Sequence, residues 1–302
     1  SETMTYANNA PHKPGLVLIT GATGGFGGAF ARRFAAIGSR LVLAGRRADR
    51  LKALRDELKT EVHTVEVDVR DRAAIEQAFG PLPAGFNEVE TLINNAGLAL
   101  GADPAHKADP DDWETMIDTN DKGLVFCTRA LLPGMIERGR GHVVNIGSTA
   151  GNYPYPGGNV YCASKAFVKQ FSLALRADLQ GTGVRVTNVE PGMVETDFSL
   201  VRFKGDAEKA GKVYADTTPL TADDVVATFQ RLVDPANASP AASAMPFLKK
   251  EGVAKVDDHT VRFTLDRPIG TFPYFTHTYN CVILPADYAG NFAEKPIGTG
   301  PF

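Results

Sequence analysis

A short apolar run that leads directly into a glycine-rich turn constrains the fold of this chain more than any other feature. Leu16 to Ile19 are apolar, and Thr20 to Gly27 read TGATGGFG, with a helix expected to open near Gly25. Small residues let the backbone approach a dinucleotide pyrophosphate closely, and the unpaired N–H groups of a helix N-terminus attract phosphate. A strand, turn and helix of this kind are typical of a dinucleotide-binding α/β fold.

The same alternation of short apolar runs and longer helical patterns continues to about Val189. It predicts a Rossmann-type, doubly wound parallel sheet. Right-handed crossovers give the strand order 3-2-1-4-5-6, with ligands at the carboxyl ends of the first and fourth strands, where the order reverses. The six expected strands are Leu16–Thr20, Arg40–Ala44, Glu61–Val67, Val89–Asn94, Gly141–Gly147 and Gly183–Val189.

The composition excludes several classes of protein. The 302 residues hold 32 Lys and Arg against 35 Asp and Glu, without a long basic cluster, so no nucleic acid partner is expected. Residues 1–15 are polar, and no apolar run approaches the length of a membrane span, so we expect a cytoplasmic protein without a membrane partner. Three widely spaced cysteines and six histidines form no CxxC or HExxH pattern, which predicts no metal site.

The end of the second strand indicates which dinucleotide is bound. NAD sites usually place an acidic residue there, whereas this chain has Gly45, Arg46 and Arg47. Guanidinium groups match the oxygens of a 2′-phosphate, so the arginines predict NADP. The alternative is that they merely begin a solvent-exposed helix.

A second motif supplies a proton-transfer group. Tyr161 and Lys165 are four residues apart, so on a helix they share one face, and Ser148 precedes Tyr161 by thirteen residues. A phenol titrates near about 10, so Tyr161 needs Lys165 to lower its pKa before it can act as a base, while Ser148 can orient the reacting hydroxyl. The alternative is a helix with a packed Tyr and a surface Lys.

These motifs together resemble the short-chain dehydrogenase/reductase family. The likeness runs from about Pro14 to Val226 and rests on TGATGGFG, VEVDV, NNAG, Ser148, YCASK and Pro191-Gly192. It implies a catalytic tetrad of Asn120, Ser148, Tyr161 and Lys165, in which Asn120 holds a water that relays protons. It implies cofactor contacts at Gly21, Thr23, Gly25, Phe26, Gly27, Arg46, Arg47, Asp68, Val69, Asn95, Ala96, Gly97, Tyr161, Lys165, Pro191, Gly192, Val194 and Thr196.

Further segments resemble one branch of that family, the NADP-dependent 3-hydroxy acid dehydrogenases. They include NNAGLALG, DWETMIDTN, NIGSTAG, EPGMVETDFS and VRFKGD. The likeness implies oxidation of the β-hydroxyl of serine, allo-threonine or 3-hydroxy acids, and reduction of the 3-oxo acids. It also implies a homo-oligomer, a dimer or tetramer. The carboxylate of such a substrate requires a cation, and Arg202 and Lys204 are the candidates. Ser148 is the candidate for binding the substrate hydroxyl.

The C-terminal part breaks this pattern. Residues 220–302 resemble an internal fragment of the periplasmic oligopeptide-type solute-binding proteins. We therefore expect a tail at 1–13, a catalytic domain at 14–233 and a foreign segment at 234–302 that replaces the family's last strand. Two alternatives stay open: a peptide-binding transport component, or an inactive hybrid of the two families.

Two structural expectations follow for this part of the chain. Val225–Val233 has the apolar spacing of a helix that packs on the parallel sheet. The missing edge strand would come from Val261–Leu265 or Cys281–Leu284, or be absent, and an uncovered edge invites aggregation.

Overall fold

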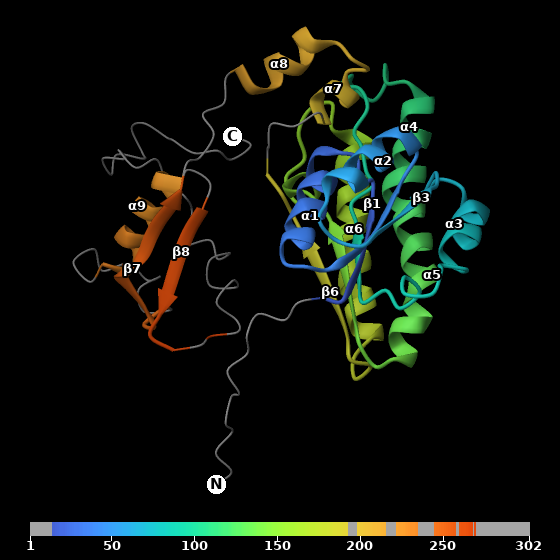
Figure 1. Ribbon diagram of the computed structural model, residues 1–302. Coiled ribbons are helices and arrows are strands. Elements are labelled where there is room, and N and C mark those ends of the chain that lie inside the picture. Colours follow the sequence, from blue (N-terminus) through green and yellow to red (C-terminus); the bar gives the residue numbers. More distant parts are fainter. Residues whose placement is uncertain are drawn as a thin grey trace. The chain divides into compact units, whose positions relative to one another are not determined.

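The computed structural model describes residues 14–192, 198–215, 222–234, 245–257, 260–267 and 269. The chain divides into two compact units, the N-terminal unit Ser1–Val213 and the C-terminal unit Tyr214–Phe302 (Figure 1).

The N-terminal unit is built on six parallel strands in the order β3-β2-β1-β4-β5-β6, which confirms the predicted topology. The strands are β1 (Leu16–Thr20), β2 (Arg40–Gly45), β3 (Val62–Glu66), β4 (Thr91–Asn94), β5 (Gly141–Ile146) and β6 (Val184–Val189). The helices are α1 (Gly25–Ala36), α2 (Ala48–Glu57), α3 (Arg72–Phe79), α4 (Pro110–Ile117), the π-helical turn η1 (Asp118–Gly123), α5 (Leu124–Glu137), the 3₁₀ turn η2 (Thr149–Gly151), α6 (Asn159–Asp178), α7 (Phe198–Arg202) and α8 (Ala207–Ala215).

Helices cover both faces of this sheet. On one face α1 and α2 pack on β1 and β2 through side chains such as Ala31 and Leu51. On the other face α3, α5 and α6 bury side chains such as Ile75, Met135 and Leu175. All five residues of β1 are buried, as expected of a central parallel strand covered on both sides.

The C-terminal unit has a different architecture. Its described part includes α9 (Ala222–Val233) and the antiparallel pair β7 (Leu248–Asp257) and β8 (Thr260–Leu265). Phe229 of α9 meets Phe263 of β8 edge-on, with ring centres 4.9 Å apart. The small core is completed by Val233, Met245, Phe247, Leu248 and Val253.

One expectation about this region is wrong, and one of the three alternatives for the edge strand is excluded. The helix over 225–233 was expected on the parallel sheet, yet α9 belongs to the C-terminal unit and buries its apolar side against β7 and β8. The candidate edge strand at Val261–Leu265 pairs with β7, because β7 offers it an antiparallel neighbour. Within the described residues β6 is therefore the outermost strand of the six-stranded sheet. The other candidate, Cys281–Leu284, lies outside them.

Candidate active site

The glycine-rich turn leaves room for a phosphate at the carboxyl end of β1. Gly21 has a φ of 61°, which favours glycine, and a side chain on Gly27 would collide with the Gly21 carbonyl oxygen. Helix α1 begins at Gly25 without a side-chain cap and without an acidic residue in its first turn. Its first N–H groups are therefore available to an anion.

The start of the NNAG segment is tied directly to this turn. The Asn95 side-chain amide donates to the carbonyl oxygens of Thr20 and Gly21, each at 3.0 Å. In return, the backbone N–H groups of Asn95 and Ala96 donate to the Thr20 hydroxyl at 3.1 Å. The ends of β1 and β4 are thus held together where the strand order reverses.

Two arginines follow β2, beside the turn. Arg47 donates to the Thr23 hydroxyl at 3.0 Å. Asp68, at the end of the third strand region, pairs with Arg70 at 2.6 Å, and the Arg70 hydrogen bond holds the pKa of Asp68 below its usual range, with a smaller contribution from the charge of Arg46. Positive charge therefore dominates the rim where a ribose phosphate is expected. The neighbouring Val69 is buried.

Tyr161 lies in the first turn of α6, covered by α7. Its ring contacts Phe198, with ring centres 5.7 Å apart. Burial raises the pKa of Tyr161 to about 12, while its interaction with Ser148 and the positive charge of Arg202 act in the opposite direction. The phenol is therefore protonated at neutral pH in the chain alone, and lowering of its pKa by Lys165 stays a prediction.

Lys165 follows one turn later and is 7% exposed. Its ammonium group lies 5.8 Å from the centre of the Tyr161 ring and donates to the Ile146 carbonyl oxygen at 2.8 Å. Burial lowers the pKa of Lys165 to about 8, and the negative charge of Asp121 acts in the opposite direction. The predicted helical face that joins Tyr161 and Lys165 is present in the structure.

Ser148 and Asn120 complete the group from two other elements. The Ser148 hydroxyl caps η2 by accepting from the Ala150 N–H at 3.1 Å, and the Thr149 N–H donates to the Pro191 carbonyl oxygen at 3.0 Å. Asn120 lies in η1, where its amide donates to Leu98 at 2.8 Å and to Ser164 at 3.0 Å. The π-helical turn thus places Asn120 beside the segment that follows β4.

The two candidate cations for a substrate carboxylate lie in different surroundings. Arg202 donates to the Gly101 carbonyl oxygen at 2.9 Å and to the Tyr155 hydroxyl at 3.0 Å, on the Tyr161 side. Lys204 instead pairs with Asp112 at 2.9 Å and lies 3.8 Å from Asp109. Only Arg202 therefore acts electrostatically on the reacting phenol.

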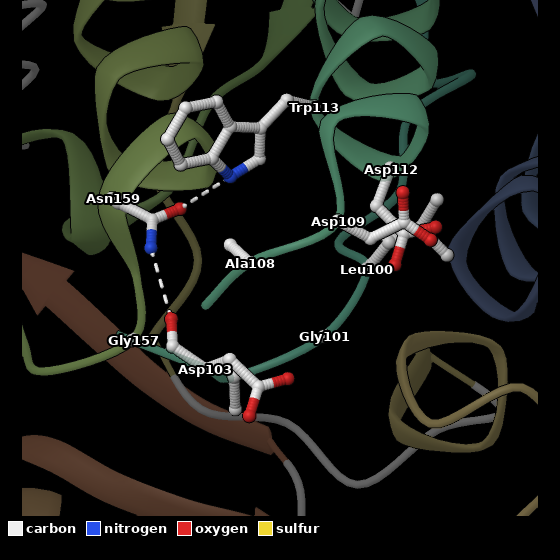
Figure 2. Close-up of a pocket in the computed structure, with 10 residues that line it drawn as sticks. Leu100, Gly101, Asp103, Ala108, Asp109, Asp112, Trp113, Gly157 and Asn159 are labelled. Atoms are coloured by element: carbon white, nitrogen blue, oxygen red, sulfur yellow. Dashed lines mark hydrogen bonds between the residues drawn. The ribbon is translucent and has the colours of Figure 1, made fainter. Parts of the chain in front are cut away.

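A small pocket adjoins this region (Figure 2). Its lining includes the Trp113 indole, which donates to Asn159 at 3.0 Å, and Asn159 in turn donates to the Asp103 carbonyl oxygen at 3.1 Å. Asp109 and Asp112 face it from the start of α4. Tyr161 does not line this pocket, which therefore lies beside the reacting groups rather than over them.

The sequence did not single out two residues of this site, Tyr155 and Asp121. The Tyr155 hydroxyl accepts a hydrogen bond from Arg202. The sequence signal that could have indicated Tyr155 is the aromatic pair in YPYPGG, directly before α6. Asp121 has no sequence signal beyond its place beside Asn120.

Two predicted cofactor contacts, Val194 and Thr196, lie outside the described residues. Among the residues that are described, no cluster of metal-binding side chains is present and no helix could cross a membrane.

Comparison with known proteins identifies the family. Residues 15–206 match the family described as short chain dehydrogenase. The chain belongs to this family. The predicted fold and the predicted class of enzyme, an oxidoreductase, are thereby confirmed. Residues 209–302 match the middle region of the bacterial extracellular solute-binding proteins, family 5, which confirms the resemblance of the C-terminal part.

Several relatives share most of the N-terminal unit. An NADP-dependent 3-hydroxy acid dehydrogenase of Salmonella typhi is 63% identical over 211 residues, 70% of this chain and 85% of that protein. Sulfoacetaldehyde reductase 2 of Chromohalobacter salexigens is 58% identical over 213 residues, 70% of this chain and 84% of that protein. Serine dehydrogenase in a closed complex with NADP+ is 54% identical, with a TM-score of 0.66 over 78% of this chain and 90% of that one.

Proposed function

We propose that the chain is an NADP-dependent oxidoreductase that oxidises the β-hydroxyl of 3-hydroxy acids, including serine and allo-threonine, and reduces the corresponding 3-oxo acids. The observation that carries the proposal is the convergence of Tyr161, Lys165 and Ser148, together with the close-packed glycine turn at the end of β1. Relatives named for the same reaction and cofactor support it.

The residues present fit the dinucleotide. The uncapped start of α1 and the bare backbone at Gly27 suit a pyrophosphate, and Arg46 and Arg47 suit a 2′-phosphate. When bound, the nicotinamide supplies the acceptor or donor for hydride.

Tyr161 is the group that moves the proton. In oxidation its phenolate accepts the hydroxyl proton, so its pKa must fall well below the value that burial imposes. Ser148 and Arg202 already act in that direction, and the ammonium of Lys165 lies 5.8 Å from the centre of the ring. Ser148 also orients the hydroxyl, because its Oγ faces the phenol as well as the η2 N–H.

Arg202 is the better of the two candidates for the substrate carboxylate. Its guanidinium is held near Tyr161 by Gly101 and Tyr155, whereas the charge of Lys204 is offset by Asp112. Replacing Arg202 with Ala should raise KM for serine about 10-fold or more, because a charged hydrogen bond is lost, with Lys204→Ala as the matched control. An unchanged KM for serine in Arg202→Ala would refute the assignment.

The test of the function is the initial rate of NADPH formation with serine, allo-threonine and 3-hydroxypropionate, beside the same reactions with NAD. We expect turnover with NADP and little with NAD. Tyr161→Phe should lower turnover by about 10²–10⁴-fold while NADPH binding persists. Absence of turnover in the intact chain, with NADPH still bound, would favour the inactive hybrid instead.

A second substrate class has a specific observation in its favour. Relatives at 57–58% identity are sulfoacetaldehyde reductases, and a guanidinium binds a sulfonate as readily as a carboxylate. Reduction of sulfoacetaldehyde faster than of a 3-oxo acid would assign the chain to that class.

We further propose a cytoplasmic homo-oligomer that associates through α5 and α6. Ile136 of α5 and Phe167 and Leu173 of α6 are each more than 40% exposed, which leaves apolar area for a second copy. Light scattering should therefore report a dimer or tetramer. A monomer at micromolar concentration would contradict this.

A further inference from the structure

The guanidinium of Arg202 carries a positive charge that no carboxylate in the described part of the chain neutralises. Its hydrogen bonds there go to uncharged groups: Nε donates to the Gly101 carbonyl oxygen at 2.9 Å, and Nη1 donates to the Tyr155 hydroxyl at 3.0 Å. Lys204 is instead paired with Asp112 at 2.9 Å. A guanidinium also carries N–H donors on Nη2, so that nitrogen of Arg202 remains available to an anion.

The segment at Gly101 fixes one side of the guanidinium. Besides accepting from Nε, Gly101 donates its own N–H to the Arg202 carbonyl oxygen at 3.0 Å, so the two residues are bonded in both directions. Gly101 has a φ of 65°, a conformation that favours glycine. The turn at Gly101 therefore anchors the inner nitrogen of Arg202 and leaves the outer nitrogens to other partners.

Tyr155 fixes the other side. The Arg202 Cζ lies 5.3 Å from the centre of the Tyr155 ring, so the ring and the hydroxyl both contact the guanidinium. The ring also packs on Gly158, where an added Cβ would lie 2.9 Å from two ring atoms. Pro154 and Pro156 flank Tyr155 and restrict its backbone. The hydroxyl is therefore presented by a stiff segment.

These two supports of Arg202 also contact each other. Gly157 has a φ of 77°, and an added Cβ there would collide with the Ala102 carbonyl oxygen. Figure 2 shows Gly101 and Gly157 along the wall of the same small pocket. The segment that holds Nε and the segment that holds Nη1 are thus packed together, which keeps the spacing of the two acceptors constant.

The held guanidinium lies on the side of the reacting phenol. Phe198 and Arg202 are four residues apart on α7, so they are neighbours on one face of that helix. The Phe198 ring contacts the Tyr161 ring, with centres 5.7 Å apart. Tyr155 packs on Gly158, one turn before Tyr161. Both partners of the Arg202–Tyr155 hydrogen bond are therefore close to the place where a substrate hydroxyl meets Tyr161.

We propose that Tyr155 is a positioning residue that gives the site its selectivity for acids: its hydroxyl holds Nη1 of Arg202, so that Nη2 meets the acid group of the substrate. The inference rests on the proposed function, in which Arg202 binds the substrate carboxylate. Tyr155 acts through Arg202, because a guanidinium that is already ordered loses less conformational freedom when the acid binds.

The first experiment compares steady-state oxidation of 3-hydroxypropionate by the full chain, Tyr155→Phe and Tyr153→Phe. Tyr155→Phe keeps the ring but removes the acceptor of Nη1, so KM should rise about 5-fold or more while kcat falls less than about 2-fold. Tyr153 is in the same YPYPGG segment and is 51% exposed, so Tyr153→Phe should keep the parent KM. An unchanged KM in Tyr155→Phe, a fall in kcat as large as the rise in KM, or loss of NADPH binding would overturn the proposal.

A double-mutant cycle with Arg202→Ala shows whether Tyr155 acts through Arg202. Without the guanidinium the Tyr155 hydroxyl has nothing to position, so adding Tyr155→Phe to Arg202→Ala should change KM less than about 2-fold. If Tyr155→Phe has its full effect on KM in the Arg202→Ala chain, the hydroxyl acts independently of Arg202 and the positioning role is wrong.

A binding measurement separates this inference from the proposed function. Calorimetric titration of 3-hydroxypropionate into the NADPH-loaded chain measures binding without reaction, because a reduced cofactor accepts no hydride. Weaker binding by Tyr155→Phe, in a chain that oxidises no hydroxy acid, would refute the proposed reaction and leave the Tyr155–Arg202 link standing. Oxidation with equal KM and equal binding in Tyr155→Phe would refute this inference alone. Absence of binding by the parent chain would refute both.

Discussion

The described residues of the two units differ in how many of them are buried, and this difference separates the groups that each unit can hold in its interior. In the N-terminal unit, helices cover both faces of a six-stranded sheet, and β1 is buried throughout. In the C-terminal unit, one described helix lies against a two-stranded pair, and most residues of β7 are exposed. The stability supplied by a large core can offset the cost of a buried ammonium at Lys165 and a half-buried carboxyl at Asp121. A small core supplies too little stability to offset such a cost.

The comparison also shows what an amphipathic helix pattern leaves open. The apolar side of α9 suits either the parallel sheet or the β7–β8 pair, because both present an apolar face. In the structure Phe229 and Val233 are buried with Met245 and Val253. A helix pattern therefore predicts that a face is buried without predicting its partner.

The largest effect is expected from removing the Phe229 ring from the core of the C-terminal unit. Phe229→Ala should cost the C-terminal unit about 3–5 kcal/mol, which is enough to unfold a unit of this size. NADPH affinity and the main thermal transition should not change. Loss of NADPH binding in Phe229→Ala would mean that the cofactor site depends on the fold of the C-terminal unit.

The corresponding test of the N-terminal unit is Gly27→Ala. Its added Cβ meets the Gly21 carbonyl oxygen, so the turn must shift at a cost of about 1–3 kcal/mol, and the pyrophosphate contact should weaken with it. Gly211→Ala is the control for chain flexibility alone, because its added Cβ meets nothing within 4 Å. Fluorescence titration with NADPH measures the effect, and equal affinity in Gly27→Ala and the parent chain would contradict the assigned turn.

A smaller effect is expected from replacing one of the two arginines, Arg46 and Arg47, that follow β2. Arg47→Ala should weaken NADP binding about 10-fold and leave NAD binding nearly unchanged, because only NADP carries the 2′-phosphate. Arg50→Ala, an exposed arginine on α2, should have little effect on either. An equal loss of affinity for NADP and NAD would show that Arg47 supports the turn through Thr23 rather than binding the 2′-phosphate.

The smallest expected effect comes from removing the C-terminal unit. A chain that ends at Val213 should bind NADPH within about twofold of the full chain, since every described cofactor residue precedes that point. Isothermal titration of both chains makes the comparison. A tenfold or larger loss would mean that the second unit supports the cofactor site.

Much of the first unit was predictable because its signals are local. Short apolar runs between helical patterns placed all six strands within two residues of their observed starts and ends, and right-handed crossovers then left one order. Tyr161 and Lys165 came from their spacing on one helix face. The glycine turn followed from residues adjacent in the chain.

The remaining features depended on neighbours that are distant in sequence. Arg202 and Lys204 are two residues apart and carry the same charge, yet one is held at Tyr155 and the other is paired with Asp112. Asp121 is ordinary in sequence, and its raised pKa arises from burial inside η1. No local pattern reports on such surroundings.

By itself, the sequence determined the family, the strand order, the cofactor turn and the Tyr161–Lys165 pair. Each of these features depends on residues that are close along the chain or separated by a fixed helical spacing. The tertiary structure alone decided which core receives α9, which cation faces the phenol and which carboxyl acts on Lys165. Those outcomes depend on burial and on Coulomb interactions across folded elements, which exist only once distant segments have packed together.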